Sequence, residues 1–319
     1  MNLNTKRVYL NTINLKDKTF LLSYGYDLNP LKQSIKQVGL LNPPILRKKS
    51  NATHQVICGY KRVLVLRKLG IPSLTSTIVP PEISDKKSLL LSLYDNISHR
   101  EFNPIEKSMA IIKLQNYYTE EKIVHDFLPV LKLKPHITQL RAFKLLCKLE
   151  REIKDALLEG KISVHTSIQL SQMDRASRRA LGKLLIALSL SVSKQAEILD
   201  YVLEIAIREN LPVEKVIGTS EIRSILENKK LNNPQKGESI RKYLRERRYP
   251  QLTEKEKQFT YNLKQLKFPP QITLRPPPFF EGDNYHLNLR FKNLNGLKQS
   301  LQKLESLLKN HSLLTIIEG

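Results

Sequence analysis

Cysteines and long apolar runs are scarce in this 319-residue chain. The two cysteines, Cys58 and Cys147, form no CxxC pair. This excludes a disulfide framework and a cysteine-based zinc site, and it is typical of a reducing compartment. No apolar run approaches the roughly 20 residues that a membrane-spanning helix needs, and residues 1–15 lack the continuous apolar core of a signal peptide. We therefore expect a cytoplasmic protein with no membrane partner.

Acidic residues are also few relative to basic ones. The chain has 53 Lys and Arg against 30 Asp and Glu, which gives a formal net charge of +23 at pH 7. A soluble protein this basic usually binds a polyanion, and nucleic acid is the first candidate. An anionic membrane surface and simple solubility are the alternative explanations for the charge.

Residues 1–103 alternate between helical and strand-like patterns. Leu31, Ile35 and Val38 recur at helical spacing, and Gly39 is the expected C-cap. The segments that follow are predicted to be strands at 43–49 and 54–58 around a polar turn at 49–53, a helix at 60–70 and a strand at 71–79. This order predicts a small α/β domain.

The rest of the chain predicts three further parts. Residues 104–227 are expected to be helical, beginning at Pro104 with Glu106 in the first turn. Residues 228–250 predict a linker, rich in Asn, Pro and Gly up to residue 239, followed by a basic helix. The basic residues of that helix either form a solvated face or contact phosphates, and they are Arg241, Lys242, Arg245, Arg247 and Arg248.

Residues 251–319 predict a small domain in which two strands precede one helix. The strands are expected at 271–275 and 285–291. Four leucines form one stripe along the helix, at Leu297, Leu301, Leu304 and Leu308. The stripe either packs on the strand hairpin or pairs with a second copy of the chain, which would give a homodimer.

The junction "CGYKR" is the strongest local sign of a ligand. A predicted strand ends at Gly59, and Lys61 and Arg62 open the next helix. A helix N-terminus presents unpaired N–H groups and partial positive charge, so it attracts phosphate. Glycine permits close approach, and the two cations strengthen the field. A phosphate site is therefore predicted, with a solvent-facing first turn as the alternative.

Three sequence boxes follow one another in the pattern of a known family. They are LKQSIKQVGLLNPPIL, VICGYKRVLVLRKLGIP and YDNISHREFNPIEKSMAI. Together they resemble the N-terminal domain of the ParB family, over about residues 10–170. The resemblance implies an α+β ParB/sulfiredoxin-like domain at 1–103, an all-α helix-turn-helix domain at 104–227 and, with the C-terminal pattern, a small ββα domain at 251–319. It also implies a DNA-binding function in chromosome or plasmid partition.

The same resemblance implies a nucleotide pocket. ParB proteins bind CTP with Mg²⁺ and use it as a switch that closes a clamp on DNA. The implied nucleotide-binding residues are Ser34, Gly39, Asn42, Pro43, Gly59, Tyr60, Lys61, Arg62, Asn96 and Arg100. Asp95 and Asn96 would hold the metal, with Asp95 as the catalytic group of any CTP hydrolysis. Double-stranded DNA, a second copy of the chain and a Walker-type partition ATPase are the implied partners.

The chain departs from the family pattern in its pocket. The family's Gly-Glu-Arg-Arg turn is Gly-Tyr-Lys-Arg here, and Lys61 cannot form the bidentate fork that arginine forms on phosphate. The family's Glu-Asn pair is Asp95-Asn96, and His99 stands at the usual arginine position, one residue before Arg100. These differences favour nucleotide binding over efficient hydrolysis, and they leave open whether CTP is hydrolysed.

Residues 121–170 resemble the ParB helix-turn-helix. A first helix at 123–131 would precede a recognition helix at 135–149, whose outward side chains reach the DNA. The expected DNA contacts are Lys134, His136, Thr138, Gln139, Arg141 and Lys144. Lys132 replaces the usual glycine of the turn and Pro129 interrupts the first helix, so an ordinary helix pair is the alternative.

Other functions remain open on the sequence alone. The chain could be a DNA-binding transcriptional regulator whose ParB-like pocket binds no nucleotide. A ParB-like nuclease is disfavoured because no paired carboxylates stand with a lysine at endonuclease-like spacing. Sulfiredoxin, which shares the fold, carries its active cysteine inside a Gly-Cys-His-Arg turn. Here Cys58 precedes Gly59 on a predicted strand, so its thiol is expected to face the core.

Overall fold

The computed structural model describes residues 4–49, 53–308 and 310–317 of the chain. They form two compact units, Met1–Leu199 and Asp200–Gly319. The domain boundaries expected after residues 103, 227 and 250 stay predictions. Of the polar turn expected at 49–53, residues 50–52 lie outside the described residues.

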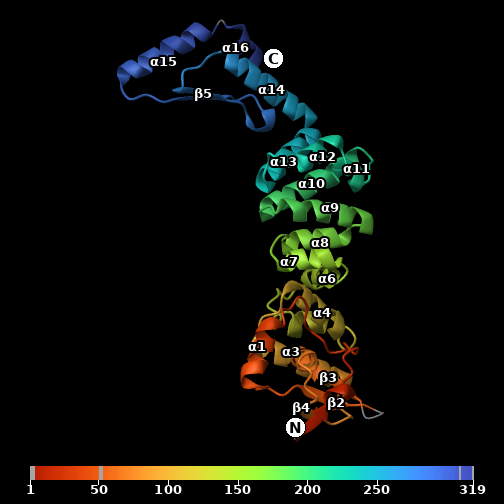
Figure 1. Cartoon of the computed structure of the whole chain (residues 1–319). Helices are drawn as coiled ribbons and strands as arrows, with labels where there is room; N and C mark the ends of the chain where they lie inside the picture. Colours follow the sequence, from red (N-terminus) through yellow and green to blue (C-terminus); the bar gives the residue numbers. More distant parts are fainter. Residues whose placement is uncertain (1–3, 50–52, 309, 318–319) are drawn as a thin grey trace. The chain divides into compact units, whose positions relative to one another are not determined.

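A four-stranded sheet forms the base of the first unit (Figure 1). Its strands, in spatial order, are β1 (Asn4–Tyr9), β4 (Ser73–Val79), β2 (Ile45–Lys48) and β3 (His54–Cys58). The β2–β4 pair is parallel, and the β1–β4 and β2–β3 pairs are antiparallel. The strands predicted in this region are confirmed, but β1 was missed. Val8 is the one hydrophobic residue that this edge strand buries among exposed polar neighbours, so its sequence shows no clear alternation.

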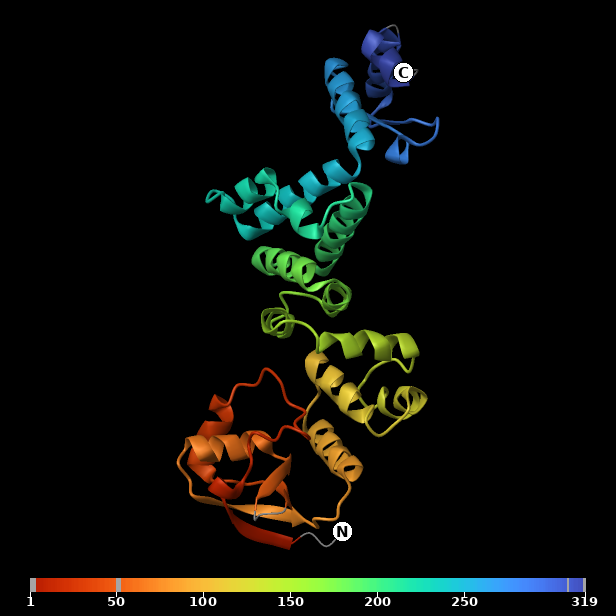
Figure 2. The same cartoon turned by 90° about the vertical axis from the view of Figure 1, so that its right-hand side faces the viewer.

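Three helices pack around this sheet and are best followed in Figure 2. They are α1 (Asn29–Val38), α2 (Tyr60–Lys68) and α3 (Asp85–His99). Ile35, Val63 and Leu66 from α1 and α2 share one core with residues of the strands. The predicted C-cap of α1 is confirmed, because the Gly39 N–H donates to the Ile35 carbonyl at 3.1 Å with φ at +77°. α3 contacts β3.

The first unit continues with helices, as predicted. α4 (Pro104–Leu114) opens with a capping box in which Asn103 and Glu106 each accept the other's backbone N–H. The elements that follow are α5 (Glu120–Lys122), a π-helical turn η3 (Ile123–Phe127), α6 (Ile137–Leu146), α7 (Arg151–Leu158), α8 (Val164–Gln172), α9 (Arg175–Leu188) and the start of α10 (Val192–Arg208), whose later residues belong to the second unit. The short 3-10 turns are η1 (Leu10–Thr12) and, in the second unit, η4 (Pro278–Phe280).

The second unit combines helices with one hairpin. Its helices are α11 (Val213–Ile217), α12 (Ser220–Glu227), α13 (Asn233–Arg248), α14 (Pro250–Gln265), α15 (Leu294–Leu307) and α16 (His311–Ile317). β5 (Ile272–Arg275) and β6 (His286–Leu289) pair antiparallel. The elements therefore follow the predicted order strand, strand, helix, with α14 before them and α16 after them.

The linker predicted at 228–239 is wrong from residue 233 onward. Asn232 caps α13 through a box with Gln235, and Pro234 sits in the first turn, where its missing N–H costs nothing. The Asn-Pro pair that indicated a turn therefore starts a helix.

Three arginines of α13 form ion pairs with carboxylates of the second unit. Arg247 pairs with Glu209, Arg248 pairs with Glu204, and Arg245 lies 2.7 Å from Glu256. These three arginines therefore form neither the solvated face nor the free phosphate contacts that the sequence suggested, because carboxylates of the protein already pair with them.

Two of the four leucines in the stripe of α15 are exposed, whereas Leu297 and Leu304 are half-buried. Leu301 is 50% exposed and Leu308 63% exposed, whereas Ser300 and Leu307 are the residues that α15 buries. Packing on the hairpin therefore does not account for these two leucines. Among the described residues, no helix combines the length and the apolar character needed to cross a membrane.

Candidate functional site

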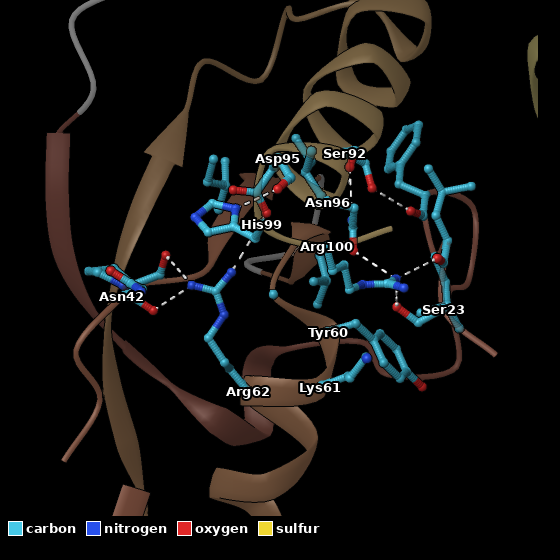
Figure 3. Close-up of a pocket in the computed structure, with 18 of the residues that line it drawn as sticks. Ser23, Asn42, Tyr60, Lys61, Arg62, Ser92, Asp95, Asn96, His99 and Arg100 are labelled. Carbon is cyan, nitrogen blue, oxygen red and sulfur yellow. Dashed lines mark hydrogen bonds and ion pairs between the residues drawn. The ribbon is translucent and has the colours of Figure 1, made fainter. Parts of the chain in front are cut away.

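A cavity of about 530 Å³ opens where β3 meets α2, beside α3 (Figure 3). Nine residues predicted to bind nucleotide or metal line it: Asn42, Pro43, Gly59, Tyr60, Lys61, Arg62, Asp95, Asn96 and Arg100. The fold thus brings together residues from three separate stretches of the sequence. What each of them binds stays a prediction.

Two of the predicted residues do not join this group. Ser34 and Gly39 are absent from the lining of the cavity, and both are exposed. The reason is the orientation of α1: Ile35 is the residue that this helix buries, so its neighbour Ser34 faces solvent. The first sequence box reaches the cavity through Leu31, Asn42 and Pro43 instead.

Gly59 sets the entry into α2. Its φ of +84° lies in the left-handed region, and it occupies the N-cap position. A Cβ at this position would lie 2.8 Å from Pro44 Cβ and 2.9 Å from Arg62 Nε. Both the backbone conformation and the space therefore require glycine. The first N–H groups of α2, which lack intrahelical partners, begin directly beside the cavity.

Arg62 connects two walls of the cavity. Its Nη1 donates to the backbone oxygens of Asn42 (2.6 Å) and Pro43 (3.3 Å), and its Nη2 lies 3.8 Å from Asp95 Oδ2. Figure 3 shows this guanidinium between Asn42 and Asp95. A ligand that binds Arg62 must compete with these protein groups.

Arg100 has four protein partners on the other side of the cavity. It lies 2.5 Å from Glu106 Oε2 and donates to Asn96 Oδ1 at 3.1 Å. It also donates to the Leu22 carbonyl and to Ser23 Oγ, each at 3.1 Å. Because Glu106 is almost fully buried, the Arg100–Glu106 pair is a fixed part of the structure.

Lys61 supplies a third positive charge. Burial lowers the pKa of Lys61, and the nearby Arg100 cation lowers it further. The Lys61 ammonium lies 4.8 Å from the centre of the Tyr26 ring, a cation–π contact. Two cations that raise each other's energy in a half-buried cavity favour an anionic ligand.

Asp95 and Asn96 bring oxygen atoms to the same cavity. These are hard ligands of the kind Mg²⁺ prefers, and that metal commonly takes only one or two protein ligands beside substrate phosphates. Within 4–49, 53–308 and 310–317, no three His, Cys, Asp or Glu side chains cluster as a metal site of their own. The pair therefore fits a metal that arrives with a phosphate ligand.

Cys58 lies outside the cavity lining and is only 2% exposed, as expected for a thiol that faces the core. Burial and the neighbouring Asp95 carboxylate raise the pKa of the Cys58 thiol. A buried thiol held in its protonated form is a poor nucleophile, which disfavours the sulfiredoxin-like alternative.

One wall of the cavity was missed in the sequence. Phe20, Leu22 and Ser23 line the cavity, and Ser92 joins them from α3. The wall is an irregular segment with no motif, and it is placed by hydrogen bonds such as that from Ser92 Oγ to the Phe20 carbonyl at 2.8 Å. No local pattern signals such long-range bonds.

The predicted DNA-contacting residues lie on and just before α6. Leu140, Phe143 and Leu146 are buried as expected, and the exposed residues are Lys134, His136, Thr138 and Arg141, with Gln139 and Lys144 half-buried. His136 is the N-cap of α6 and accepts the Thr138 N–H at 3.3 Å, so part of its role is structural. Lys132 adopts a φ of +55°, a left-handed conformation that glycine adopts most easily. This explains why the family usually has glycine at this position of the turn.

The family comparison agrees with the first two sequence boxes and with the start of the third. The model of the ParB N-terminal domain matches residues 23–97, which include most of the cavity lining. This part of the chain belongs to the ParB N-terminal domain family. The resemblance drawn from the sequence boxes is confirmed for it.

Curated relatives extend the ParB likeness beyond this domain. The chain is 26% identical over 179 residues to a probable chromosome-partitioning protein ParB of Chlamydia muridarum, covering 54% of this chain and 61% of that protein. It is 25% identical over 191 residues to a nucleoid occlusion protein of Geobacillus thermodenitrificans, covering 59% and 65%. The chain thus spans about three fifths of the length of these relatives.

Solved ParB structures were also found among the matches. They include a Pnob8-like ParB-N domain (14% identity, 58% of this chain and 93% of that chain, TM-score 0.38). Another is a C-terminally truncated ParB from Caulobacter crescentus complexed to the centromeric parS site (17% identity, 60% and 96%, TM-score 0.35).

Proposed function

We propose that this chain is a ParB-like DNA-binding protein whose N-terminal cavity binds CTP as a switch, with a role in chromosome or plasmid partition. One observation carries the proposal. Lys61, Arg62 and Arg100 meet the N-terminus of α2 and the Asp95–Asn96 pair in one cavity, and all of these except Arg100 lie within residues 23–97, which match the ParB N-terminal domain. Three cations beside unpaired amides suit a triphosphate, and the oxygen pair suits its metal.

The cavity residues divide the work of binding. The α2 amides and Arg62 hold phosphate oxygens, with Lys61 acting as a point charge where the family has an arginine. Asp95 and Asn96 would hold Mg²⁺, which neutralises charge between the phosphates. To bind the metal, Asp95 must turn from Arg62 toward the ligand. Asn96 must likewise give up the hydrogen bond that its Oδ1 accepts from Arg100.

Binding without efficient hydrolysis is the expectation for this site. Asp95 is one methylene shorter than the family's glutamate, and its carboxylate faces Arg62. We expect CTP to act mainly through occupancy of the cavity. Any hydrolysis should be slow and should depend on Asp95.

Calorimetric titration of the full chain with CTP and Mg²⁺ tests the nucleotide half of the proposal. Wild type should release or absorb heat with a saturable curve, whereas Arg62→Ala should lose most of the affinity. Arg67→Ala removes an exposed cation from the last turn of the same helix and serves as the matched control. Equal curves for the two variants, or no binding by wild type, would overturn a CTP site at α2.

We propose that α6 is the recognition helix of a helix-turn-helix. Its outward residues carry donors for bases and phosphates, and the positive φ of Lys132 supplies the turn before it. DNA affinity should fall steeply with salt, and Arg141→Ala should weaken it. Arg179→Ala, on the exposed face of α9, should leave affinity unchanged. A salt-independent affinity, or equal effects of both variants, would contradict this assignment.

We further propose that the exposed leucines of α15 form a homodimer contact. Leu301 and Leu308 lie seven residues apart, on one side of this helix, and are 50% and 63% exposed. Leu301→Asp should shift the chain to the monomer in sedimentation equilibrium, and Gln302→Asp, at an exposed neighbouring position, should not. A partition ATPase of the Walker type is the partner that a ParB-like role implies, testable by co-purification from the native host.

One observation favours a second candidate function. Arg62 and Arg100 already have protein partners, so neither guanidinium group needs a ligand to satisfy its hydrogen bonds. A DNA-binding transcriptional regulator with a nucleotide-independent ParB-like domain would look the same. It predicts the full salt dependence of DNA binding with no response to CTP.

A further inference from the structure

The 17–25 segment forms one wall of the cavity without regular secondary structure. Asp17, Phe20 and Ser23 are among its residues that line the cavity. Its backbone is held by side chains of two helices: Ser92 Oγ of α3 donates to the Phe20 carbonyl (2.8 Å), and Lys113 Nζ of α4 donates to the Thr19 carbonyl (2.6 Å). The position of the wall therefore depends on α3 and α4.

Arg100, which lines the cavity, and the buried Glu106 behind it hold the same segment. Arg100 donates to the Leu22 carbonyl and to Ser23 Oγ, each at 3.1 Å. Glu106 accepts from Arg100 with one carboxylate oxygen (2.5 Å) and from the Tyr24 N–H with the other (3.0 Å). One guanidinium thus serves both the predicted phosphate site and the wall beside it.

The far end of the segment lies directly against α7. The Tyr24 hydroxyl donates to Asp155 Oδ1 at 3.0 Å. Burial, together with this bond, raises the pKa of Tyr24 to about 12, so the hydroxyl stays a donor at any physiological pH. Gly25 has a φ of +64°, a conformation that favours glycine, and a Cβ there would lie 2.1 Å from Leu158 Cδ1, so the end of the Leu158 side chain packs directly against this backbone.

We infer that a phosphate bound at Arg100 and the Tyr24–Asp155 contact with α7 oppose each other through the 17–25 segment. A phosphate competes for the N–H groups that Arg100 now gives to Leu22 and Ser23. When those bonds are lost, the segment loosens and its contact with α7 weakens. This rests on the proposed CTP site and adds how its occupancy reaches the helices that follow α6. Because such coupling is reciprocal, weakening the α7 contact must strengthen phosphate binding.

The test uses substitutions that remove the contact without touching the cavity lining. Tyr24→Phe deletes the donor and Asp155→Ala deletes the acceptor, and neither residue lines the cavity. Tyr9→Phe, at an exposed side chain of β1, is the matched control. Calorimetry with CTP and Mg²⁺ should show affinity about two- to tenfold higher for Tyr24→Phe than for wild type, the range of one net hydrogen bond. The double variant should match the single ones, since both break one contact.

Hydrogen exchange gives the second readout, in the full chain. Adding CTP to wild type should raise exchange in residues 17–25 and in α7, and in Tyr24→Phe the α7 amides should exchange faster before CTP is added and change little afterwards. If wild type binds CTP but α7 does not respond, or if Tyr24→Phe binds CTP no better than Tyr9→Phe, this inference is overturned while the CTP site stands. If wild type binds no CTP, the proposed site and this inference fall together.

Discussion

Gly59→Ala is the substitution whose outcome the structure defines most sharply. Two costs add at this position. A non-glycine residue in the left-handed conformation costs about 1–2 kcal/mol. The new methyl group would also lie 2.8 Å from Pro44 Cβ and 2.9 Å from Arg62 Nε, and overpacking of this kind costs about 1–3 kcal/mol.

Pro44 cannot easily relieve this clash. Its carbonyl accepts the Thr77 N–H (3.0 Å) and the Ser76 hydroxyl (2.8 Å), which fixes it in the sheet. The flexible neighbour, Arg62, is therefore the group that moves, and its bonds to Asn42 and Pro43 are lost. We expect Gly59→Ala to destabilise the first unit by about 2–5 kcal/mol in total and to weaken CTP binding as well.

Gly70→Ala is the matched control. Gly70 has a φ of +71°, close to that of Gly59, but nothing lies within 4 Å of a Cβ placed there. It should cost only the backbone share, about 1–2 kcal/mol, and leave CTP binding unchanged. Hydrogen exchange of the β2 and β3 amides measures how much each of the two variants destabilises the first unit. Equal losses in the two variants would show that crowding at Arg62 is absent and would refute this account of the junction.

Two further predictions concern pH. The pKa of Lys61 is below its ordinary value of 10.5, and CTP affinity should fall as pH rises through this lowered pKa because the ammonium loses its charge. The Lys61→Arg variant should keep its CTP affinity to higher pH. Identical pH profiles for the variant and wild type would rule out this role for Lys61. In the second unit, the Arg247 hydrogen bond lowers the pKa of Glu209 below 4.5. The ion pair stabilises the folded state fully above pH 4.5, and this stabilisation is lost as pH falls through the lowered pKa of Glu209. In urea unfolding, Glu209→Gln should therefore lose less stability in acid than wild type does.

Local patterns in the sequence were sufficient for most of the elements around the cavity. The helix at α1, the strands at β2 and β3 and the Gly59 junction follow from periodicity and glycine placement, which are short-range properties of the chain. The edge strand β1 and the helical start at Asn232 were not recognised. β1 is mostly polar, and it becomes a strand because it pairs with β4. The Asn-Pro segment has the composition of a turn, and it starts a helix because Asn232 and Gln235 form a capping box.

The sequence alone singled out the residues that are proposed to bind the nucleotide: a glycine, two cations and an Asp-Asn pair, all within the region that matches the ParB N-terminal domain. Tertiary structure alone decided what surrounds them. It gave the Arg100 guanidinium its bonds to Leu22 and Ser23 and placed the 17–25 segment as a wall of the cavity. The physical reason is range. Helix phase and capping are set by neighbours along the chain, whereas these contacts join groups up to about 80 residues apart, for which a single sequence holds no repeating signal.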